Sequence, residues 1–171
     1  MINRLICEMI HYESGCPKRI QHFTKVYAYA KLIGQAEGLC ESEQRILEAA
    51  AVVHDIGIKP SLEKYGDSLG KHQEELGPAR AEKMLLELGF DKSIVERVSF
   101  LVSRHHTYSG ISGNDWQILV EADFLVNLYE DAESREAVLA AYNKIFVTET
   151  GKRICREMFG LEFCAEASDA V

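Results

Sequence analysis

The stretch AAAVVHDIGI, residues 49–58, joins an apolar helical run to a His-Asp pair and then to a glycine. His54 follows Ala50 by four positions, so it lies at the edge of the apolar stripe of this predicted helix. Neighbouring helical positions differ by about 100° in direction. His54 and Asp55 can therefore reach one common ion only where the helix ends, and the approach to Gly57 predicts such an end.

Helical periodicity dominates on both sides of this stretch, and no alternating pattern predicts a strand. Pro17 can begin one helix and Gly38 can end it, while Ser93 followed by Glu96 forms a capping-box pattern. Ser42 and Asp115 are predicted caps of two further helices. We therefore expect an all-α bundle of about six to eight helices, over residues 2–12, 17 to about 38, 42 to about 57, 76–88, 93–106, 116–131, 134–147 and 150–159.

Two segments are predicted to be loops. Residues 58–71, IKPSLEKYGDSLGK, hold two glycines and a proline directly after the His-Asp pair, so this segment is a candidate lid or rim. Residues 107–114, TYSGISGN, are rich in turn-forming residues. No linker or repeat divides the chain. We expect one domain over residues 1–171, with a metal-binding core at about 17–131 and a helical extension at about 134–164, before a polar tail from about 165.

Composition excludes several functional classes. The 171 residues are 47% hydrophobic, enough to bury a core. Nineteen Lys and Arg against 27 Asp and Glu give a net charge of −8, which argues against stable binding of nucleic acid or of an anionic membrane. No apolar run approaches the ~20 residues of a membrane helix, and the N-terminus does not resemble a signal peptide. The odd, widely spaced cysteines indicate reduced thiols and a cytoplasmic protein; they are Cys7, Cys16, Cys40, Cys155 and Cys164.

A carboxylate on an apolar helix face requires compensation. Asp123 lies in LVEADFLVN, residues 119–127, one turn after Leu119 and three residues before Val126. A buried carboxylate without a cation or hydrogen-bond donors costs several kcal/mol. An Arg or Lys side chain could compensate it, and so could a metal ion. Imidazole nitrogens and carboxylate oxygens together suit divalent Fe, Mn, Co, Ni or Zn.

The order His…His-Asp…Asp on an all-helical chain resembles the HD superfamily of metal-dependent phosphohydrolases. HDIGI at 54–58 is similar to the central signature of that family, RIQHFTKVYAYAKLI around His22 to its first-ligand helix, and VEADFLVN around Asp123 to its last-ligand helix. The resemblance spans residues 19–127. It implies that His22, His54, Asp55 and Asp123 bind one divalent transition metal, with Fe or Mn favoured.

Many members of this family hold a second metal through two further histidines. KHQEELGPARAEKML, with His72, and LVSRHHTYSG, with His105 and His106, resemble those two segments, and Asp55 would then bridge both ions. Helical spacing favours His105, which follows Leu101 by four positions. The His-Thr pair before a glycine-containing loop resembles a branch that hydrolyses diadenosine tetraphosphate, which favours His106. Both remain candidates.

Cations near these positions are candidate phosphate contacts. Many relatives carry Lys directly after the glycine of the signature, as in HDIGK, but here Ile58 occupies that position and Lys59 comes one residue later. Arg19 lies one turn before His22, and its guanidinium could hold a phosphate through two hydrogen bonds. Other cations close in sequence to the proposed ligands are Lys18, Lys71 and Arg104.

The resemblance implies a metal-dependent phosphohydrolase acting on a small phosphorylated molecule, with a nucleotide as the expected substrate. His54 and Asp55 would carry catalysis through a metal-activated water, with Arg19 and Lys59 as phosphate contacts. Two alternatives use the same ligands. One is a di-iron oxygenase of the HD-like type, and the other is a non-catalytic metal- or nucleotide-binding module. A homodimer is compatible with the sequence.

Overall fold

The computed structural model describes residues 1–161, which form nine α-helices and one 3₁₀ turn, with no strand among them. The predicted all-α fold is confirmed. In chain order the elements are α1 (Ile2–Tyr12), α2 (Pro17–Ala36), α3 (Glu41–Val53), η1 (His54–Gly57), α4 (Ile58–Tyr65), α5 (Gly70–Glu87), α6 (Lys92–Val102), α7 (Asn114–Glu130), α8 (Arg135–Ile145) and α9 (Glu149–Phe159).

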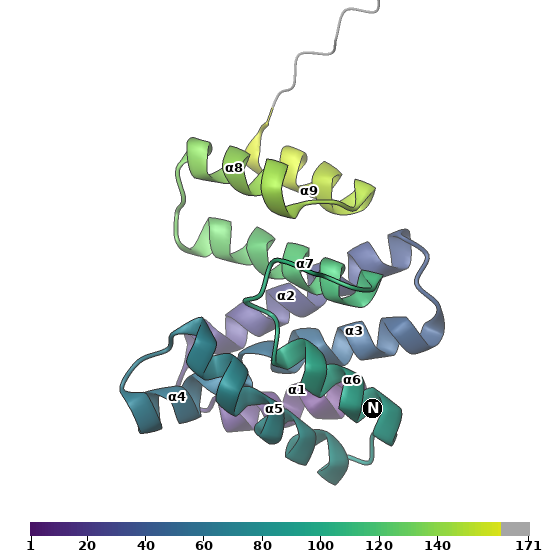
Figure 1. The fold of residues 1–171 in the computed structure, drawn as a ribbon, viewed down its shortest axis with the longest axis vertical. Helices are drawn as coiled ribbons and strands as arrows, with labels where there is room; N and C mark the ends of the chain where they lie inside the picture. Colours follow the sequence, from purple (N-terminus) through teal and green to yellow (C-terminus); the bar gives the residue numbers. More distant parts are fainter. Residues whose placement is uncertain (162–171) are drawn as a thin grey trace, which may run out of the picture.

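The helices are arranged in layers around α2, α3 and α7 (Figure 1). Helix α2 packs against both α3 and α7, and α5 packs against α6 and η1. Figure 1 shows the hairpin of α8 and α9 stacked above α7, with α4, α5 and α6 at the opposite end. The turn η1 therefore lies between the central layer and the α5–α6 pair, where groups from distant parts of the chain can meet.

Helix α3 leads directly into the His-Asp pair and is buried at that end. Its last five residues, 49–53, are all completely buried, and so is the following side chain, that of His54. Helix α7 is apolar around most of its circumference, which is typical of a helix buried on several sides. The ends of α3 and α7 are thus held rigidly by packing on both sides of η1.

Gly57 allows α5 to approach η1 closely. A Cβ atom at this position would lie 2.5 Å from the backbone oxygen of Gln73, well inside van der Waals contact. Gly77 continues the contact one turn along α5, since a Cβ there would lie 3.5 Å from Gly57 Cα. The two glycines bring the backbones of η1 and α5 together directly beside the His-Asp pair.

The segment 58–71, predicted to be a loop, is mostly helical. Pro60 falls in the first turn of α4, where its missing N–H has no intrahelical partner to lose. Gly66, with φ of 74°, then ends α4 in a left-handed conformation. Helix α5 begins at Gly70, six residues earlier than predicted, and contains Pro78 in its interior. Helix α4 therefore forms part of the fold next to η1.

Four further predicted helix ends differ from the structure. The N-cap of α3 is Cys40 and not Ser42. The N-cap of α6 is Asp91, and α6 ends at Val102, so His105 and His106 lie in the turn that follows it. The N-cap of α7 is Gly113, because Asp115 pairs with Arg97 at 2.7 Å. These differences shift helix ends by two to four residues and leave the order of the helices unchanged.

A buried carboxylate anchors the α8–α9 hairpin. The Glu121 side chain accepts hydrogen bonds from the backbone N–H groups of Val147 and Thr148, at 2.7 and 2.9 Å, and from the Thr148 hydroxyl. It thereby ties the beginning of α9 to α7. None of the helices within residues 1–161 is long and apolar enough to cross a membrane. The four cysteines in this range are unpaired, while Cys164 and the predicted polar tail lie outside it.

Candidate metal centre

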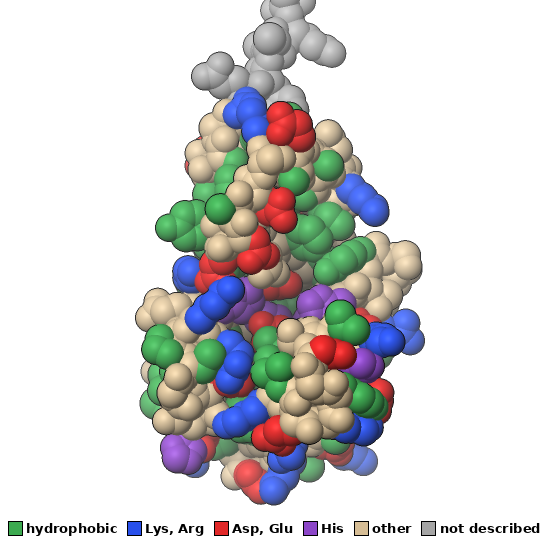
Figure 2. Space-filling view, turned by 90° about the vertical axis from the view of Figure 1, so that its left-hand side faces the viewer, with side chains coloured by type: hydrophobic (Ala, Val, Ile, Leu, Met, Phe, Trp, Pro, Cys, Tyr) green, Lys and Arg blue, Asp and Glu red, His purple; other side chains and the backbone are tan. Residues whose placement is uncertain are grey.

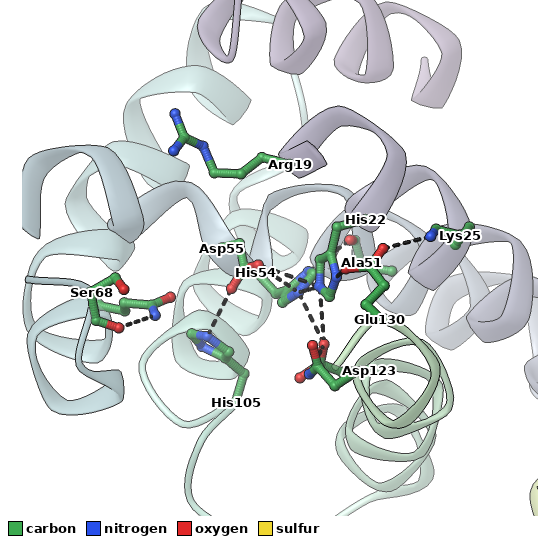
Figure 3. A network of polar contacts seen from close by, with 12 residues as sticks. Arg19, His22, Lys25, Ala51, His54, Asp55, Ser68, His105, Asp123 and Glu130 are labelled. Atoms are coloured by element: carbon green, nitrogen blue, oxygen red, sulfur yellow. Dashed lines mark hydrogen bonds and ion pairs between the residues drawn. The ribbon is translucent and has the colours of Figure 1, made fainter. Parts of the chain in front are cut away.

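Imidazoles and carboxylates from three separate elements converge beside η1 (Figure 3). His22 comes from α2, His54 from η1 and Asp123 from α7. The Nε2 atoms of His22 and His54 lie 3.3 Å apart, and Asp123 Oδ1 lies 3.2 Å from the first and 3.5 Å from the second. All three side chains are buried. The structure thus brings together residues separated by up to 101 positions in the sequence.

Asp55 completes this group. Its Oδ2 atom lies 3.4 Å from Nε2 of His22 and 3.4 Å from Nε2 of His54. Oδ2 of Asp55 thus lies beside the two imidazole nitrogens that also face Asp123, and the five distances among these atoms run from 3.2 to 3.5 Å. Atoms bonded to one ion at about 2.0–2.1 Å in tetrahedral geometry lie roughly 3.3–3.4 Å apart. The spacing of this group fits a first-row divalent ion.

Hydrogen bonds on the far side of each imidazole turn its Nε2 atom inward. His54 donates from Nδ1 to the carbonyl oxygen of Ala51 at 2.9 Å, and His22 donates from Nδ1 to Glu130 Oε2 at 3.1 Å. A neutral imidazole with its proton on Nδ1 keeps a lone pair on Nε2. Both rings therefore present their metal-binding atom to the centre.

A second group lies on the other side of Asp55. Asp55, His105 and His106 each offer a ligand atom, and these atoms lie within 4.8 Å of one another. His105 donates from Nδ1 to the carbonyl oxygen of Val102 at 2.8 Å. Among the described residues, the buried Nε2 atoms of His105 and His106 have no hydrogen-bond partner. An ion bound here would satisfy both atoms, so the group also fits a metal, and it holds both histidines of the doublet.

The pKa shifts in the first group reflect the pairing of its carboxylates with its imidazoles. Burial by itself raises the pKa of Asp55 and Asp123, but the neighbouring imidazoles lower both pKa values far below the usual range. Burial lowers the pKa of His54, and Asp55 followed by Asp123 more than reverses this and raises it to about 9. The two carboxylates are thus ionised in the core. A cation between them would take over the charge balance that the protonated imidazoles otherwise provide.

In the second group the pKa of a histidine is lowered and not raised. Burial, followed by repulsion from His105, lowers the pKa of His106 to about 4. His106 is therefore neutral at physiological pH, as a metal ligand must be. Tyr108 lies beside it, with its hydroxyl oxygen 3.4 Å from Nδ1 of His106. Burial, followed by repulsion from Asp123 and Glu74, raises the pKa of Tyr108 to about 12, so this hydroxyl stays protonated.

Sequence analysis missed the residues that hold the ligands in place. Asn127 donates from Nδ2 to Asp123 Oδ1 at 2.9 Å, and Glu130 accepts from His22. These two residues follow Asp123 by four and seven positions, so all three lie on one face of α7. Lys25, three positions after His22 on α2, lies 2.5 Å from Glu130 Oε1. Helical spacing from each predicted ligand is the signal that could have found them.

A pocket of about 270 Å³ opens onto the first group. Figure 2 shows histidine side chains in a hollow across the middle of the molecule, with charged side chains at its edge. Lys18 and Arg19 contribute cations to the lining, and Ile58 and Leu62 contribute an apolar wall from α4. The rest of the lining is polar and consists of His22, Asp55, Ser68, Asn127, Glu130 and Asp131.

Of the predicted cations near the site, the structure places Lys18 and Arg19 at the pocket. Arg19 is bound through Nε to the buried Glu13 at 2.5 Å, which leaves its two Nη groups outside this bond. Lys59 does not reach the pocket. Because α4 begins at Ile58, Lys59 turns toward α1 and donates to the carbonyl oxygen of Tyr12 at 2.8 Å. Lys59 thus has another partner in this structure, and its role as a phosphate contact stays a prediction.

His72 lies outside both ligand groups. It sits in the first turn of α5, where its Nδ1 pairs with Asp67 Oδ1 at 2.7 Å and its ring stacks on Tyr65. The earlier start of α5 places it there. Six of the seven predicted metal ligands, Asp55 among them, thus lie in the two ligand groups. The seventh, His72, has other partners in this structure.

Comparisons with known proteins identify the family and the fold. The sequence profile of the HD domain matches residues 19–142. The fold is similar to a crystal structure of a predicted HD superfamily hydrolase from an uncultured Thermotogales bacterium, with a TM-score of 0.67 and 24% sequence identity over 92% of this chain and 84% of that one. No curated protein sequence matched the chain.

Proposed function

Since the match over residues 19–142 shows that this chain belongs to the HD domain family, we propose that it is a metal-dependent phosphohydrolase of a small phosphorylated molecule. The observation that carries this proposal is the position of Asp55 between two groups of ligand atoms. One oxygen lies 3.4 Å from His22 and His54, and the other lies 3.6 Å from His105. A carboxylate shared in this way is suited to hold two divalent ions side by side.

Six residues would hold the ions in this proposal. His22, His54, Asp123 and one oxygen of Asp55 would bind the first, and the other oxygen of Asp55 with His105 and His106 would bind the second. When bound, divalent ions supply Lewis acidity and a water of lowered pKa, the chemistry that phosphate ester and anhydride hydrolysis requires. We propose Fe or Mn as the ions, because the resemblance to the HD superfamily implies them and a mixture of imidazole and carboxylate without thiolate is compatible with both.

The pocket lining supports a phosphate as the group that is bound. Lys18 and Arg19 place two cations beside the ligands His22 and Asp55, in a protein of net charge −8. Glu13 fixes Arg19 through Nε, and a guanidinium held at one edge can still donate two parallel hydrogen bonds to a phosphate. These two side chains would bind and orient the phosphate.

The opposite walls of the pocket support a nucleotide as the substrate. Ile58 and Leu62 offer an apolar surface on which a base could lie. Asn127 and Asp131, at the end of α7, offer hydrogen-bonding groups suited to sugar hydroxyls. An apolar wall, polar groups and cations within one pocket of about 270 Å³ match the three chemical parts of a nucleotide.

The proposal is tested by metal analysis of the purified protein, followed by a phosphate-release screen over nucleotides and sugar phosphates with Mn²⁺ or Co²⁺. We expect bound metal and release of phosphate from nucleotides. Oxygen consumption by the iron-loaded protein, without phosphate release, would replace the hydrolase with the oxygenase. Tight nucleotide binding without any product would replace it with a binding module.

A further inference from the structure

The histidines that face the centre differ in what holds their outer nitrogen. His54 and His105 donate from Nδ1 to backbone carbonyl oxygens, those of Ala51 and Val102. Each carbonyl lies three residues before its histidine in the same segment. The orientation of these two rings is therefore set by local backbone structure. His22 has no such carbonyl partner, and its Nδ1 instead contacts a side chain 108 residues away, that of Glu130.

Glu130 is itself held in place. Its Oε2 lies 3.1 Å from Nδ1 of His22, while its Oε1 lies 2.5 Å from Nζ of Lys25. The Glu130 side chain is 11% exposed, whereas Lys25 is 37% exposed. Lys25 and His22 lie on neighbouring turns of α2, so both oxygens of Glu130 are engaged by one helix. Figure 3 shows Glu130 between Lys25 and the ligand group.

We propose that Glu130 is a positioning residue that holds the His22 ring with Nε2 toward the centre and strengthens it as a metal ligand, and that Lys25 acts through Glu130. This inference rests on the proposed function, because it takes the ligand group to bind a divalent ion. Neither residue belongs to the two candidate ligand groups. Through these two residues, the orientation of His22 depends on the contact between α2 and α7.

The charge of Glu130 is what distinguishes this contact from the two carbonyl contacts. A carboxylate that accepts from Nδ1–H draws the proton toward itself and increases the electron density on Nε2 more than a neutral carbonyl does. It also fixes the tautomer that leaves Nε2 free. Loss of such an outer contact typically weakens metal binding roughly 10–100-fold. Glu130→Gln removes the charge while keeping the size of the side chain and an oxygen that accepts from His22.

The experiment titrates the metal-free full chain with Co²⁺ in competition with a chromophoric chelator and records the visible spectrum of the bound ion. We compare the wild type with Glu130→Gln, Lys25→Met, the double variant, and Glu133→Gln as a matched control at an exposed position near the same end of α7. We expect Glu130→Gln to weaken Co²⁺ binding at least about tenfold and to shift the spectrum. We expect a smaller loss for Lys25→Met and no change for Glu133→Gln.

The double variant tests whether Lys25 affects metal binding through Glu130. If Lys25 acts through Glu130, Lys25→Met adds no further loss of affinity in the Glu130→Gln background. Additive losses would overturn the role of Lys25. Unchanged Co²⁺ affinity and spectrum in a folded Glu130→Gln protein would overturn the role of Glu130. If Glu130→Gln does not fold, unchanged affinity and spectrum in Lys25→Met would overturn the inference instead.

Failure of the proposed function gives a different result. A wild-type protein that binds no Co²⁺ would overturn both the function and the inference. A wild type that binds Co²⁺ and releases phosphate, together with an unaffected Glu130→Gln variant, would overturn the inference alone.

Discussion

Oδ1 of Asp55 lies 3.6 Å from Nε2 of His105, an atom that is buried and has no hydrogen-bond partner within residues 1–161. The other oxygen of the same carboxylate faces His22 and His54 at 3.4 Å. A single aspartate thus lies between two ligand groups, one with His22, His54 and Asp123 and the other with His105 and His106. The proposed two-ion chemistry depends on both oxygens of this residue.

Replacement of Asp55 by Asn should abolish phosphate release and remove most of the bound metal, because the shared carboxylate charge is lost from both groups. The side chain keeps its size, so circular dichroism should report unchanged helical content. Glu82→Gln, at an exposed position of α5, serves as the control and should keep wild-type activity. A metal-free Asp55→Asn protein with full activity would contradict the proposed mechanism.

Replacement of His105 by Ala should remove one of two bound ions, because His105 contributes to the second group only. Replacement of His72 by Ala should leave both ions in place, since His72 pairs with Asp67 and stacks on Tyr65. Metal-to-protein ratios measured by mass spectrometry distinguish the two variants. Loss of an ion from His72→Ala would show that His72 moves into the site when metal binds.

Removal of the metal should lower the melting temperature. An ion that binds only the folded chain raises the free energy of unfolding, by about 2.7 kcal/mol when its free concentration is one hundred times the Kd. For a chain of this size that corresponds to a shift of several degrees. Melting curves with and without a chelator, followed by addition of Mn²⁺, measure the effect. Identical curves in all three conditions would argue against metal binding in the folded state.

Replacement of Gly57 by Ala should destabilise the protein by about 1–3 kcal/mol. The new Cβ would lie 2.5 Å from the backbone oxygen of Gln73, so η1 and α5 must separate. Denaturant unfolding measures the loss, and Glu82→Ala controls for a substitution to Ala elsewhere. A Gly57→Ala protein as stable as the wild type would show that α5 moves away from η1 at little cost.

Replacement of Arg19 by Ala should raise KM roughly tenfold or more, because a charge-assisted hydrogen bond to phosphate contributes about 1.5–3 kcal/mol. The effect on kcat should be smaller, since Arg19 is not among the ligand groups. Lys59→Ala provides a comparison, because Lys59 points toward Tyr12 and away from the pocket. Steady-state kinetics of both variants test whether Arg19 binds the phosphate. An equal rise in KM for Arg19→Ala and Lys59→Ala would contradict this role.

Most of the residues proposed from the sequence as ligands lie close together in the structure, because helical spacing and residue chemistry agree there. Asp123 stood out as a carboxylate on an apolar face, and the structure places it 3.2 Å from His22. The segment around Lys59 was harder, because Pro60 suggested a loop where it in fact lies in the first turn of α4. That one helix redirects Lys59 toward α1.

Contacts between distant helices could not be predicted in the same way. The bond between His22 and Glu130 depends on the packing of α2 against α7, which no local pattern of either helix specifies. The position of His72 similarly depends on where α5 begins. Residue types therefore pointed to the candidate ligands, and tertiary packing decided which side chains contact them.

One face of α7 carries Asp123, Asn127 and Glu130. Their alignment depends on the number of residues between them as well as on their identity. Inserting a single residue between Asp123 and Asn127 would rotate one part of this set relative to the other by about 100°. Every side chain would still be present, yet they could no longer meet Asp123 and His22 in the same place. Within this segment, an evolving lineage can exchange residues far more freely than it can gain or lose one.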